Sequence, residues 1–256
     1  MLFIGVDLGT SAVKLLLMDE TGKIHKIVSK EYPLYFPQPG WSEQNPQDWI
    51  RQSMEGIKEL TAQCDKSQIK GISFGGQMHG LVVLDEKDQV IRPAILWNDG
   101  RTGKQTDYLN QEIGKETLSR YTGNIAFAGF TAPKILWMRE KEPENFARVR
   151  KIMLPKDYLA FYLSGEFSTD FSDASGTLLL DVEHKCWSEK MMEICGIRKS
   201  QLPKLYESWE PTGIIKPEIA EELGIPQNVK IIAGAGDNAA AAVGTRTVGE
   251  GQCNLS

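Results

Sequence analysis

The chain has 256 residues, of which 41% are hydrophobic and 25% are charged, and its formal net charge is −5 at pH 7. This is the composition of an ordinary globular protein with enough apolar material for a sizeable core. A mildly acidic chain without basic clusters has no electrostatic attraction for nucleic acid or an anionic membrane, which excludes both as expected partners.

The N-terminus does not resemble a signal peptide, and no apolar run approaches the roughly 20 residues of a membrane span. The four cysteines are scattered and form no CxxC pair, so free thiols in a reducing cytosol are expected. These features predict a soluble cytoplasmic protein.

The first thirty residues predict a three-stranded β-meander. Stretches 2–6, 13–18 and 23–29 have the apolar or alternating pattern of strands, and Asp19-Glu20-Thr21-Gly22 is a typical turn. A loop rich in proline and aromatic residues follows at 32–41. A helix is then expected from Asn45-Pro46 to Leu60, because its apolar residues recur at helical spacing.

Further strands are expected at 69–74, 81–84 and 90–95, the last two around a turn at 85–88. Residues 101–223 are more helical in pattern. A strand at 229–233 leads into Gly234-Ala235-Gly236-Asp237-Asn238, and an alanine-rich helix follows at 239–243. Residues 251–256 resemble the approach to another strand. Strands at both ends of a helical middle predict a mixed α/β core with a long insertion.

The glycine-containing segment 5–11 lies between the first two predicted strands. Glycine lets phosphate oxygens approach backbone N–H groups, while Thr10 and Ser11 add hydroxyl donors and Lys14 lies close by in sequence. Asp7, at the strand end, could hold Mg²⁺ through water. The segment is not a P-loop, because GxxxxGK[ST] is absent and a strand follows. An ordinary hairpin turn is the alternative interpretation.

Gly75-Gly76-Gln77-Met78-His79-Gly80 follows an apolar strand and suits a loop that closes on a small polar ligand. His79 can exchange a hydrogen bond with a sugar hydroxyl, and Met78 can pack on the carbon face. The alternative is that His79 is a purely structural residue.

Asp237 lies between a strand and a helix of small residues. A helix N-cap is one interpretation, since Asp is favoured there. A carboxylate facing substrate is the other, and the two are compatible because one oxygen can cap while the other faces the pocket.

Several blocks in one order carry a family resemblance. Besides the segments above, they are 93–101 (PAILWNDGR), 129–134 (GFTAPK), 154–159 (LPKDYL) and 172–177 (SDASGT). Together they resemble bacterial xylulose kinases of the FGGY carbohydrate-kinase family over effectively the whole chain. The first segment also resembles the phosphate loop of the actin, Hsp70 and sugar-kinase superfamily.

The resemblance implies an RNase-H-like α/β fold, a mixed sheet flanked by helices. Its core would comprise residues 1–96 and 226–256, with a largely helical insertion at 97–225. Members of the family have a second, nucleotide-binding domain with another phosphate loop, which this chain would lack. We therefore expect a sugar-binding half that folds alone but turns over little ATP, and whose uncovered cleft leaves room for a homodimer.

The resemblance further implies an ATP- and Mg²⁺-dependent kinase that transfers the γ-phosphate to the 5-hydroxyl of D-xylulose, giving D-xylulose 5-phosphate. Asp237 would be the catalytic base, with Asp7 assisting through water-bound Mg²⁺. The implied phosphate-binding residues are Gly9, Thr10, Ser11 and Lys14. The implied sugar-pocket residues are Met78, His79, Trp97, Asp99, Asp237 and Asn238.

Some of these roles have structural alternatives, because Trp97 fits a core position and Asp99 fits the turn Asn98-Asp99-Gly100. The closest rival function is another FGGY kinase, acting on L-ribulose, gluconate, glycerol or L-fuculose. A non-catalytic nucleotide-binding module of the actin or Hsp70 type is the rival from another class, but those proteins lack the blocks at 75–80 and 93–101.

Overall fold

The structure, a computed structural model, describes residues 1–253. Its strands are β1 (Leu2–Leu8), β2 (Ala12–Asp19), β3 (Ile24–Glu31), β4 (Glu43–Gln44), β5 (Ile69–Gly76), β6 (Val82–Leu84), β7 (Ala94–Ile95), β8 (Lys151–Met153), β9 (Ser168–Asp170), β10 (Leu180–Asp181), β11 (Cys186–Trp187), β12 (Lys204–Tyr206), β13 (Pro211–Ile214), β14 (Lys230–Ile232) and β15 (Ala235–Gly236). The strand approach expected at 251–256 lies partly outside the described residues.

The helices are α1 (Pro46–Leu60), α2 (Gly103–Asp107), α3 (Lys115–Thr122), α4 (Thr131–Lys141), α5 (Pro143–Arg148), α6 (Pro155–Ser164), α7 (Phe171–Ser175), α8 (Glu189–Cys195), α9 (Pro217–Leu223) and α10 (Asp237–Gly244). A π-helical segment, η2 (Tyr108–Gly114), joins α2 to α3, and single 3₁₀ turns lie at Lys66–Gln68 and Lys199–Gln201. No helix within residues 1–253 is both long and apolar enough to cross a membrane.

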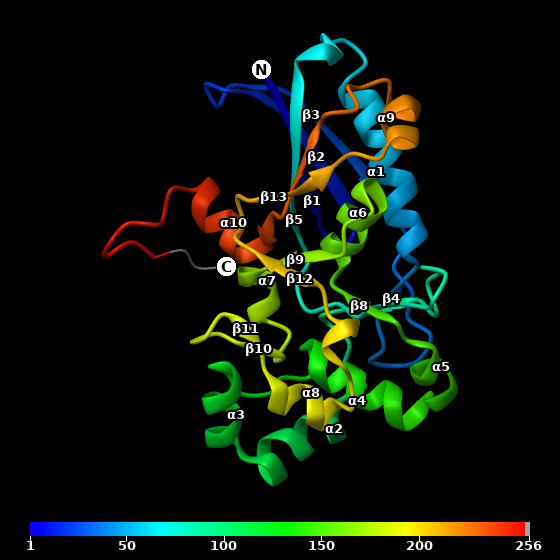
Figure 1. Cartoon of the computed structure of the whole chain (residues 1–256), viewed down its shortest axis with the longest axis vertical. Helices are drawn as coiled ribbons and strands as arrows, with labels where there is room; N and C mark the ends of the chain where they lie inside the picture. Colours follow the sequence, from blue (N-terminus) through cyan, green and yellow to red (C-terminus); the bar gives the residue numbers. More distant parts are fainter. Residues whose placement is uncertain (254–256) are drawn as a thin grey trace.

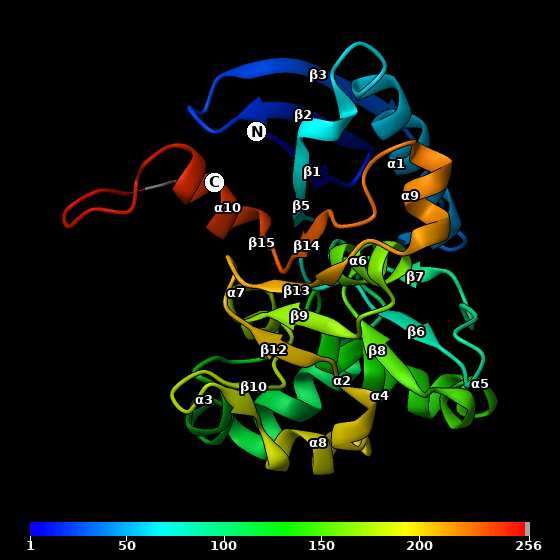
Figure 2. The ribbon, with the colours of Figure 1, turned by 45° about the horizontal axis from the view of Figure 1, so that its top comes forward.

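The main sheet has the strand order β13-β14-β5-β1-β2-β3, with β15 also paired to β5. Strands β1, β2 and β3 form the predicted antiparallel meander, whereas β5 runs parallel to β1 and β14 runs parallel to β5. Helices flank this mixed sheet, as Figures 1 and 2 show, and the predicted fold class is therefore confirmed.

Helix α1 covers one face of the meander. Asn45 caps it by accepting a hydrogen bond from the Gln47 N–H, and Pro46 begins it, because the first turn needs no proline donor. Its apolar stripe, which includes Trp49 and Ile57, is buried against the sheet.

A second apolar core lies on the other side of the molecule, in the half that contains α2, α3, α4 and α8 (Figure 2). The segment 97–225 is not all separate from the main sheet, however. Strand β13 belongs to that sheet, and side chains of α6 and α9 belong to the first core. The expected boundary at residue 225 therefore does not coincide with the edge of the sheet.

The strand predicted at 90–95 is mostly absent. Only Ala94–Ile95 forms a strand, paired with β4, and Val90 makes an isolated bridge to Leu84. Pro93 explains the interruption, because proline has no N–H to donate to a sheet.

Candidate active site

Three neighbouring strands end at one place. In the register of the sheet, Asp7 and Ala235 both pair with Gly75, from opposite sides of β5. Leu8 and Gly236 pair likewise with Gly76. A Cβ added at Gly75 would lie 3.4 Å from the Cβ of Ala240 on α10, so the absence of a side chain at Gly75 helps to keep the space between Asp7 and the start of α10 open.

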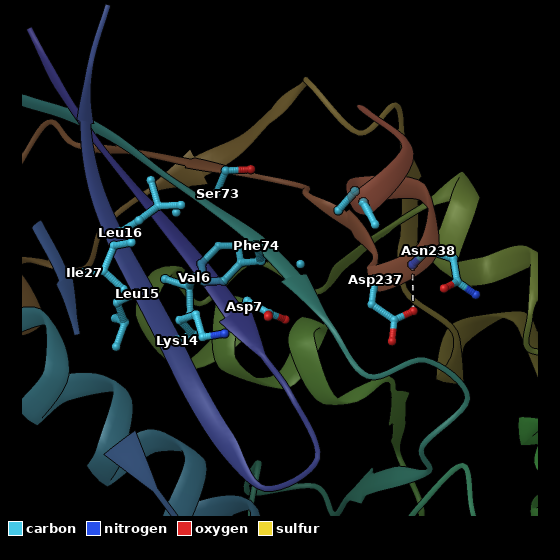
Figure 3. A pocket seen from close by; sticks show the side chains of 14 residues that line it. Val6, Asp7, Lys14, Leu15, Leu16, Ile27, Ser73, Phe74, Asp237 and Asn238 are labelled. Atoms are coloured by element: carbon cyan, nitrogen blue, oxygen red, sulfur yellow. Dashed lines mark hydrogen bonds between the residues drawn. The ribbon is translucent and has the colours of Figure 1, made fainter. Parts of the chain in front are cut away.

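A pocket of about 550 Å³ occupies this space (Figure 3). Asp7 and Lys14 enter it from the adjacent strands β1 and β2, and Asp237 enters it from the first turn of α10. Asn238 also lines the pocket, but its side chain is directed away from Asp7. The rest of its lining is largely apolar. The structure thus brings together four of the residues singled out in the sequence.

The two carboxylates of the pocket are open to solvent at its mouth yet partly enclosed. Burial raises the pKa of Asp7, and the nearby Lys14 charge opposes that rise. Burial also raises the pKa of Asp237, which the Asn238 N–H opposes and the negative charge of Asp7 reinforces. Each carboxylate therefore gains affinity for a proton or another cation.

Asp237 is the first residue of α10, and Gly236 occupies the N-cap position. One oxygen of Asp237 accepts a 2.7 Å hydrogen bond from the Asn238 N–H. That bond fixes the rotamer, and the second oxygen is left to face the pocket. Asp237 is thus not the N-cap itself, although it does satisfy an N–H of the first turn.

Two side chains fix the loop between β1 and β2 by donating hydrogen bonds to its carbonyl groups. The Gly9 carbonyl accepts from the Tyr32 hydroxyl at 2.5 Å, and the Thr10 carbonyl accepts from the Gln44 side-chain amide at 2.6 Å. The Gly9 N–H is itself used, because it donates to the Ala12 carbonyl.

The next two N–H groups of this loop remain for a ligand. Within residues 1–253, no backbone acceptor is paired with the N–H of Thr10 or of Ser11. Two consecutive N–H groups with hydroxyls beside them are a suitable cradle for an anion.

His79 has a left-handed backbone, with φ of 66°. Its Nδ1–H donates a 2.8 Å hydrogen bond to the Gly176 carbonyl, and its ring packs on Phe130 with centroids 4.6 Å apart. Burial first, and then the Lys134 charge, lower the pKa of His79 to about 4. The ring is therefore neutral at pH 7, and Nε2 is an acceptor suited to a hydroxyl donor.

Lys134 and Thr131, on α4, hold the His79 loop in this conformation. The Lys134 ammonium donates to the carbonyls of His79 and Gly129, at 2.8 and 2.5 Å, and the Thr131 hydroxyl donates to the His79 carbonyl. In the sequence, 129–134 served only as a block of family resemblance. Nothing in its composition marks Lys134 as buried.

Trp97 and Asp99 are placed differently. Trp97 is half-exposed and its indole N–H donates to the Thr10 hydroxyl. Asp99 is buried, with one oxygen on the Ser42 N–H and both oxygens on Arg101. The turn interpretation matches this arrangement of Asp99, since it accepts the N–H two residues ahead.

Met78 connects the His79 loop to the loop at 234–236, which precedes Asp237. A Cβ added at Gly236 would lie 2.9 Å from the Met78 sulfur, so the two loops touch only because residue 236 is glycine. His79 and Trp97 do not line the pocket of Asp7 and Asp237 but lie on loops that adjoin it.

The carboxylates of the pocket are compatible with one mode of Mg²⁺ binding. Within residues 1–253, no group of three or more His, Cys, Asp or Glu side chains could hold a metal. Mg²⁺, however, is commonly held by one or two carboxylates together with water and substrate phosphates. Two partly enclosed carboxylates in one pocket fit that mode and do not fit an all-protein cage.

The chain is similar to carbohydrate kinases over nearly its whole length. The model of the FGGY family of carbohydrate kinases, N-terminal domain, matches residues 2–244. The xylulose kinase of Lactococcus lactis subsp. lactis is 49% identical over 249 residues, 96% of this chain and 50% of that protein. The xylulose kinase of Escherichia coli is 42% identical over 255 residues, 100% of this chain and 52% of that protein.

Solved structures of carbohydrate kinases have the same fold. A xyloylose kinase from Brucella ovis superposes with a TM-score of 0.94 and 43% identity, covering 98% of this chain and 52% of its own. A gluconate kinase from Lactobacillus acidophilus superposes with a TM-score of 0.92 and 32% identity, covering 96% of this chain and 50% of its own. The chain spans about half the length of the curated relatives it matches.

Proposed function

The chain belongs to the FGGY family of carbohydrate kinases, and from that premise we propose that the whole protein phosphorylates D-xylulose. The γ-phosphate of ATP passes to the 5-hydroxyl, giving D-xylulose 5-phosphate. Support comes from the curated relatives, several of which are named xylulose kinases at 37–49% identity. In this proposal the present chain supplies the sugar-binding half.

One observation carries the proposal: Asp7 and Asp237 face a single pocket from opposite sides of β5. Phosphoryl transfer has a loose transition state, so the protein mainly aligns the reactants and stabilises charge. Asp237 is the base that accepts the proton of the sugar hydroxyl. Burial raises the pKa of Asp237, which makes it a better proton acceptor than an ordinary carboxylate.

The phosphate end is assigned to the loop between β1 and β2. Thr10 and Ser11 offer backbone N–H groups and hydroxyls, and Lys14 offers a positive charge across from Asp7. Gly9 contributes the close backbone approach but not its N–H, which is used internally. Asp7 would hold Mg²⁺ through water, and the ion would supply positive charge against the phosphate oxygens.

The sugar end is assigned to Met78, His79, Trp97 and Asn238. Neutral His79 offers Nε2 to a hydroxyl, because Nδ1–H is committed to Gly176. Asp99 keeps a supporting role in this proposal, because its carboxylate is buried and fully used by Arg101 and Ser42.

The test is an assay of Mg-ATP-dependent phosphorylation in the protein at its full natural length, across pentuloses, gluconate and polyols. We expect D-xylulose to be preferred and Asp237→Asn to abolish turnover while sugar binding persists. Activity retained in Asp237→Asn would refute the assignment of the base. If the wild-type protein prefers another sugar and Asp237→Asn is still inactive, the proposed mechanism stands and only the proposed substrate is wrong.

Gluconate is the second candidate substrate. The gluconate kinase from Lactobacillus acidophilus superposes with a TM-score of 0.92, close to the 0.94 of the xyloylose kinase. The sugar panel separates the two, because gluconate carries a carboxylate that D-xylulose lacks.

The predicted cytoplasmic location and homodimer also belong to this proposal. Cell fractionation and sedimentation of the full-length protein check them.

A further inference from the structure

A buried ionic cluster lies beneath the ends of the site-bearing strands. The Lys156 ammonium is 2.7 Å from Asp157, 2.8 Å from Asp170 and 3.5 Å from Asp173, and all four side chains are almost completely buried. Burial alone would lower the pKa of Lys156, but the three carboxylates outweigh it and raise that pKa. The lysine is therefore charged and its position is set by its partners.

This cluster touches the strand ends directly. A Cβ added at Gly76 would lie 3.4 Å from the Lys156 Cβ, and one added at Gly236 would lie 3.5 Å from an Asp173 oxygen. Gly76 and Gly236 are paired in the sheet, immediately before the site loops. The ions therefore lie under the same two strands that carry the candidate site.

Asp170 links the Lys156 cluster to the loop that precedes Asp237 through a series of hydrogen bonds. One oxygen of Asp170 faces Lys156, and the other accepts hydrogen bonds from the Ser172 N–H, the Ser172 hydroxyl and the Ser208 hydroxyl, at 2.8, 2.5 and 3.0 Å. The Ser172 hydroxyl oxygen in turn accepts from the Gly236 N–H at 3.2 Å. The Ser208 carbonyl accepts from the Gly234 N–H at 3.1 Å.

The loop at 234–236, called the base loop below because it precedes the proposed base Asp237, needs this external support. The N-cap residue of α10 is Gly236, which has no side chain to cap the helix, and α10 buries none of its residues. Gly234 has φ of +75°, and a Cβ there would lie 2.1 Å from the Phe74 carbonyl oxygen. The loop thus has a special conformation and few contacts of its own, apart from the two residues of β15 that pair with β5.

We propose that Asp170, anchored by Lys156, is a positioning residue for the proposed kinase: through Ser172 and Ser208 it fixes the backbone at 234–236 and thereby places the Asp237 carboxylate. This inference rests on the proposed role of Asp237 as base. A geometric role also accounts for the ions themselves, because a buried ion pair is often no more stable than an apolar replacement.

The decisive variant is Ser172→Ala, because it removes the acceptor of the Gly236 N–H but leaves Asp170 bonded to Lys156, the residue 172 N–H and Ser208. Ser164→Ala is the matched control. The Ser164 hydroxyl also donates one hydrogen bond and accepts one backbone N–H, from Glu166, but at the far end of α6. Both are made in the full-length protein, together with Ser172→Thr, which retains the hydroxyl.

Two quantities are measured, sugar phosphorylation kinetics and amide hydrogen exchange at Gly236. We expect Ser172→Ala to lower kcat by about 10- to 100-fold, the cost of a small misplacement of a reacting group. The KM for ketose should barely change, because the lost interaction acts in the transition state. Exchange at Gly236 should accelerate. Ser164→Ala should alter neither quantity, and Ser172→Thr should restore most of kcat.

The outcomes are distinguishable. Faster exchange at Gly236 with unchanged kcat would overturn the proposal, as would equal kinetic losses in Ser172→Ala and Ser164→Ala. Asp170→Asn, if it folds, should lower kcat at least as far as Ser172→Ala. Absence of sugar phosphorylation in the wild-type protein would instead refute the proposed function, and the exchange rates alone would then decide whether Ser172 fixes the loop.

Discussion

The indole N–H of Trp97 donates a 2.9 Å hydrogen bond to the hydroxyl oxygen of Thr10. This bond joins the loop after β7 to the loop between β1 and β2, 87 residues apart in sequence. A hydroxyl that accepts from an indole keeps its own proton to donate. In the proposed kinase, Thr10 can donate that proton to a phosphate oxygen.

Trp97→Phe keeps an aromatic ring and removes this one hydrogen bond. We expect the KM for MgATP to rise about five- to tenfold, since one such bond contributes about 1 kcal/mol. The KM for ketose should change less. Initial-rate kinetics check this, with Trp209→Phe as control, because Trp209 is 74% exposed. A larger effect on ketose than on MgATP would show that this hydrogen bond serves the sugar end, to which the ring of Trp97 is assigned, and not the phosphate end.

Gly176→Ala tests the placement of His79. Gly176 has φ of −76°, which alanine adopts without strain, but a Cβ there would lie 2.4 and 2.6 Å from two atoms of the His79 ring. The ring must move, so we expect the KM for ketose to rise about tenfold, equivalent to about 1.4 kcal/mol.

Gly103→Ala is the matched control, because a Cβ at Gly103 meets no atom within 4 Å. It should leave ketose binding unchanged. Equal behaviour of the two alanine variants would show that the His79 ring position does not matter for the sugar.

The pKa of His79 predicts a pH dependence of stability. In the folded protein this pKa is about 4, below its value of 6.5 in the unfolded chain, so the unfolded state binds more protons between these limits. The free energy of unfolding should therefore fall as pH drops from about 6.5 through 4, by about 3 kcal/mol from this group.

His79→Asn should flatten that part of the curve, because asparagine tolerates a left-handed backbone and does not titrate. Denaturant unfolding between pH 4 and 7 measures both proteins. Parallel curves for wild type and variant would contradict the lowered pKa of His79.

The lowered pKa of Lys134 predicts a second pH range, above neutrality, in which the stability of the protein changes. Burial lowers its pKa to about 7, so the unfolded chain, with a lysine of pKa 10.5, binds more protons between these values. The wild-type protein should gain stability as pH rises from about 7 to 10. Lys134→Met should lose that gain and raise the KM for ketose, because the carbonyl of His79 loses a donor.

Lys141→Met is the control on the same helix, since Lys141 is exposed and pairs with Glu140. It should keep the rise in stability between pH 7 and 10. Thermal unfolding at several pH values distinguishes the two variants. A persistent rise in Lys134→Met would exclude Lys134 as its source.

The sequence was sufficient to predict those elements that depend on residues close together in the chain. The meander of β1 to β3, the capped start of α1 at Asn45 and the glycines before Asp237 all follow from patterns within a few residues. The strand expected at 90–95 was wrong for most of its length. Pro93 was visible there, but the apolar residues around it outweighed it in the pattern.

Roles set by distant partners could not be predicted in this way. Asp99 and Asp237 both stand beside glycine in polar turns, yet Asp99 is buried against Arg101 while Asp237 lines a pocket. Likewise Lys134 and Lys141 share one helix, and only tertiary packing buries the first. Burial depends on which chain segments cover a residue, and no local pattern contains that information.

The sequence by itself determined the mixed sheet, the glycine-rich strand ends and the two acidic residues that follow them, because backbone freedom and hydrophobic alternation are local properties. Only the tertiary structure decided that Asp7 and Asp237 share a pocket across Gly75, and that Lys156 and Asp170 lie beneath the base loop. These relationships join residues more than a hundred positions apart or separate helices and strands, and the register of β5 between β1 and β15 creates the first of them.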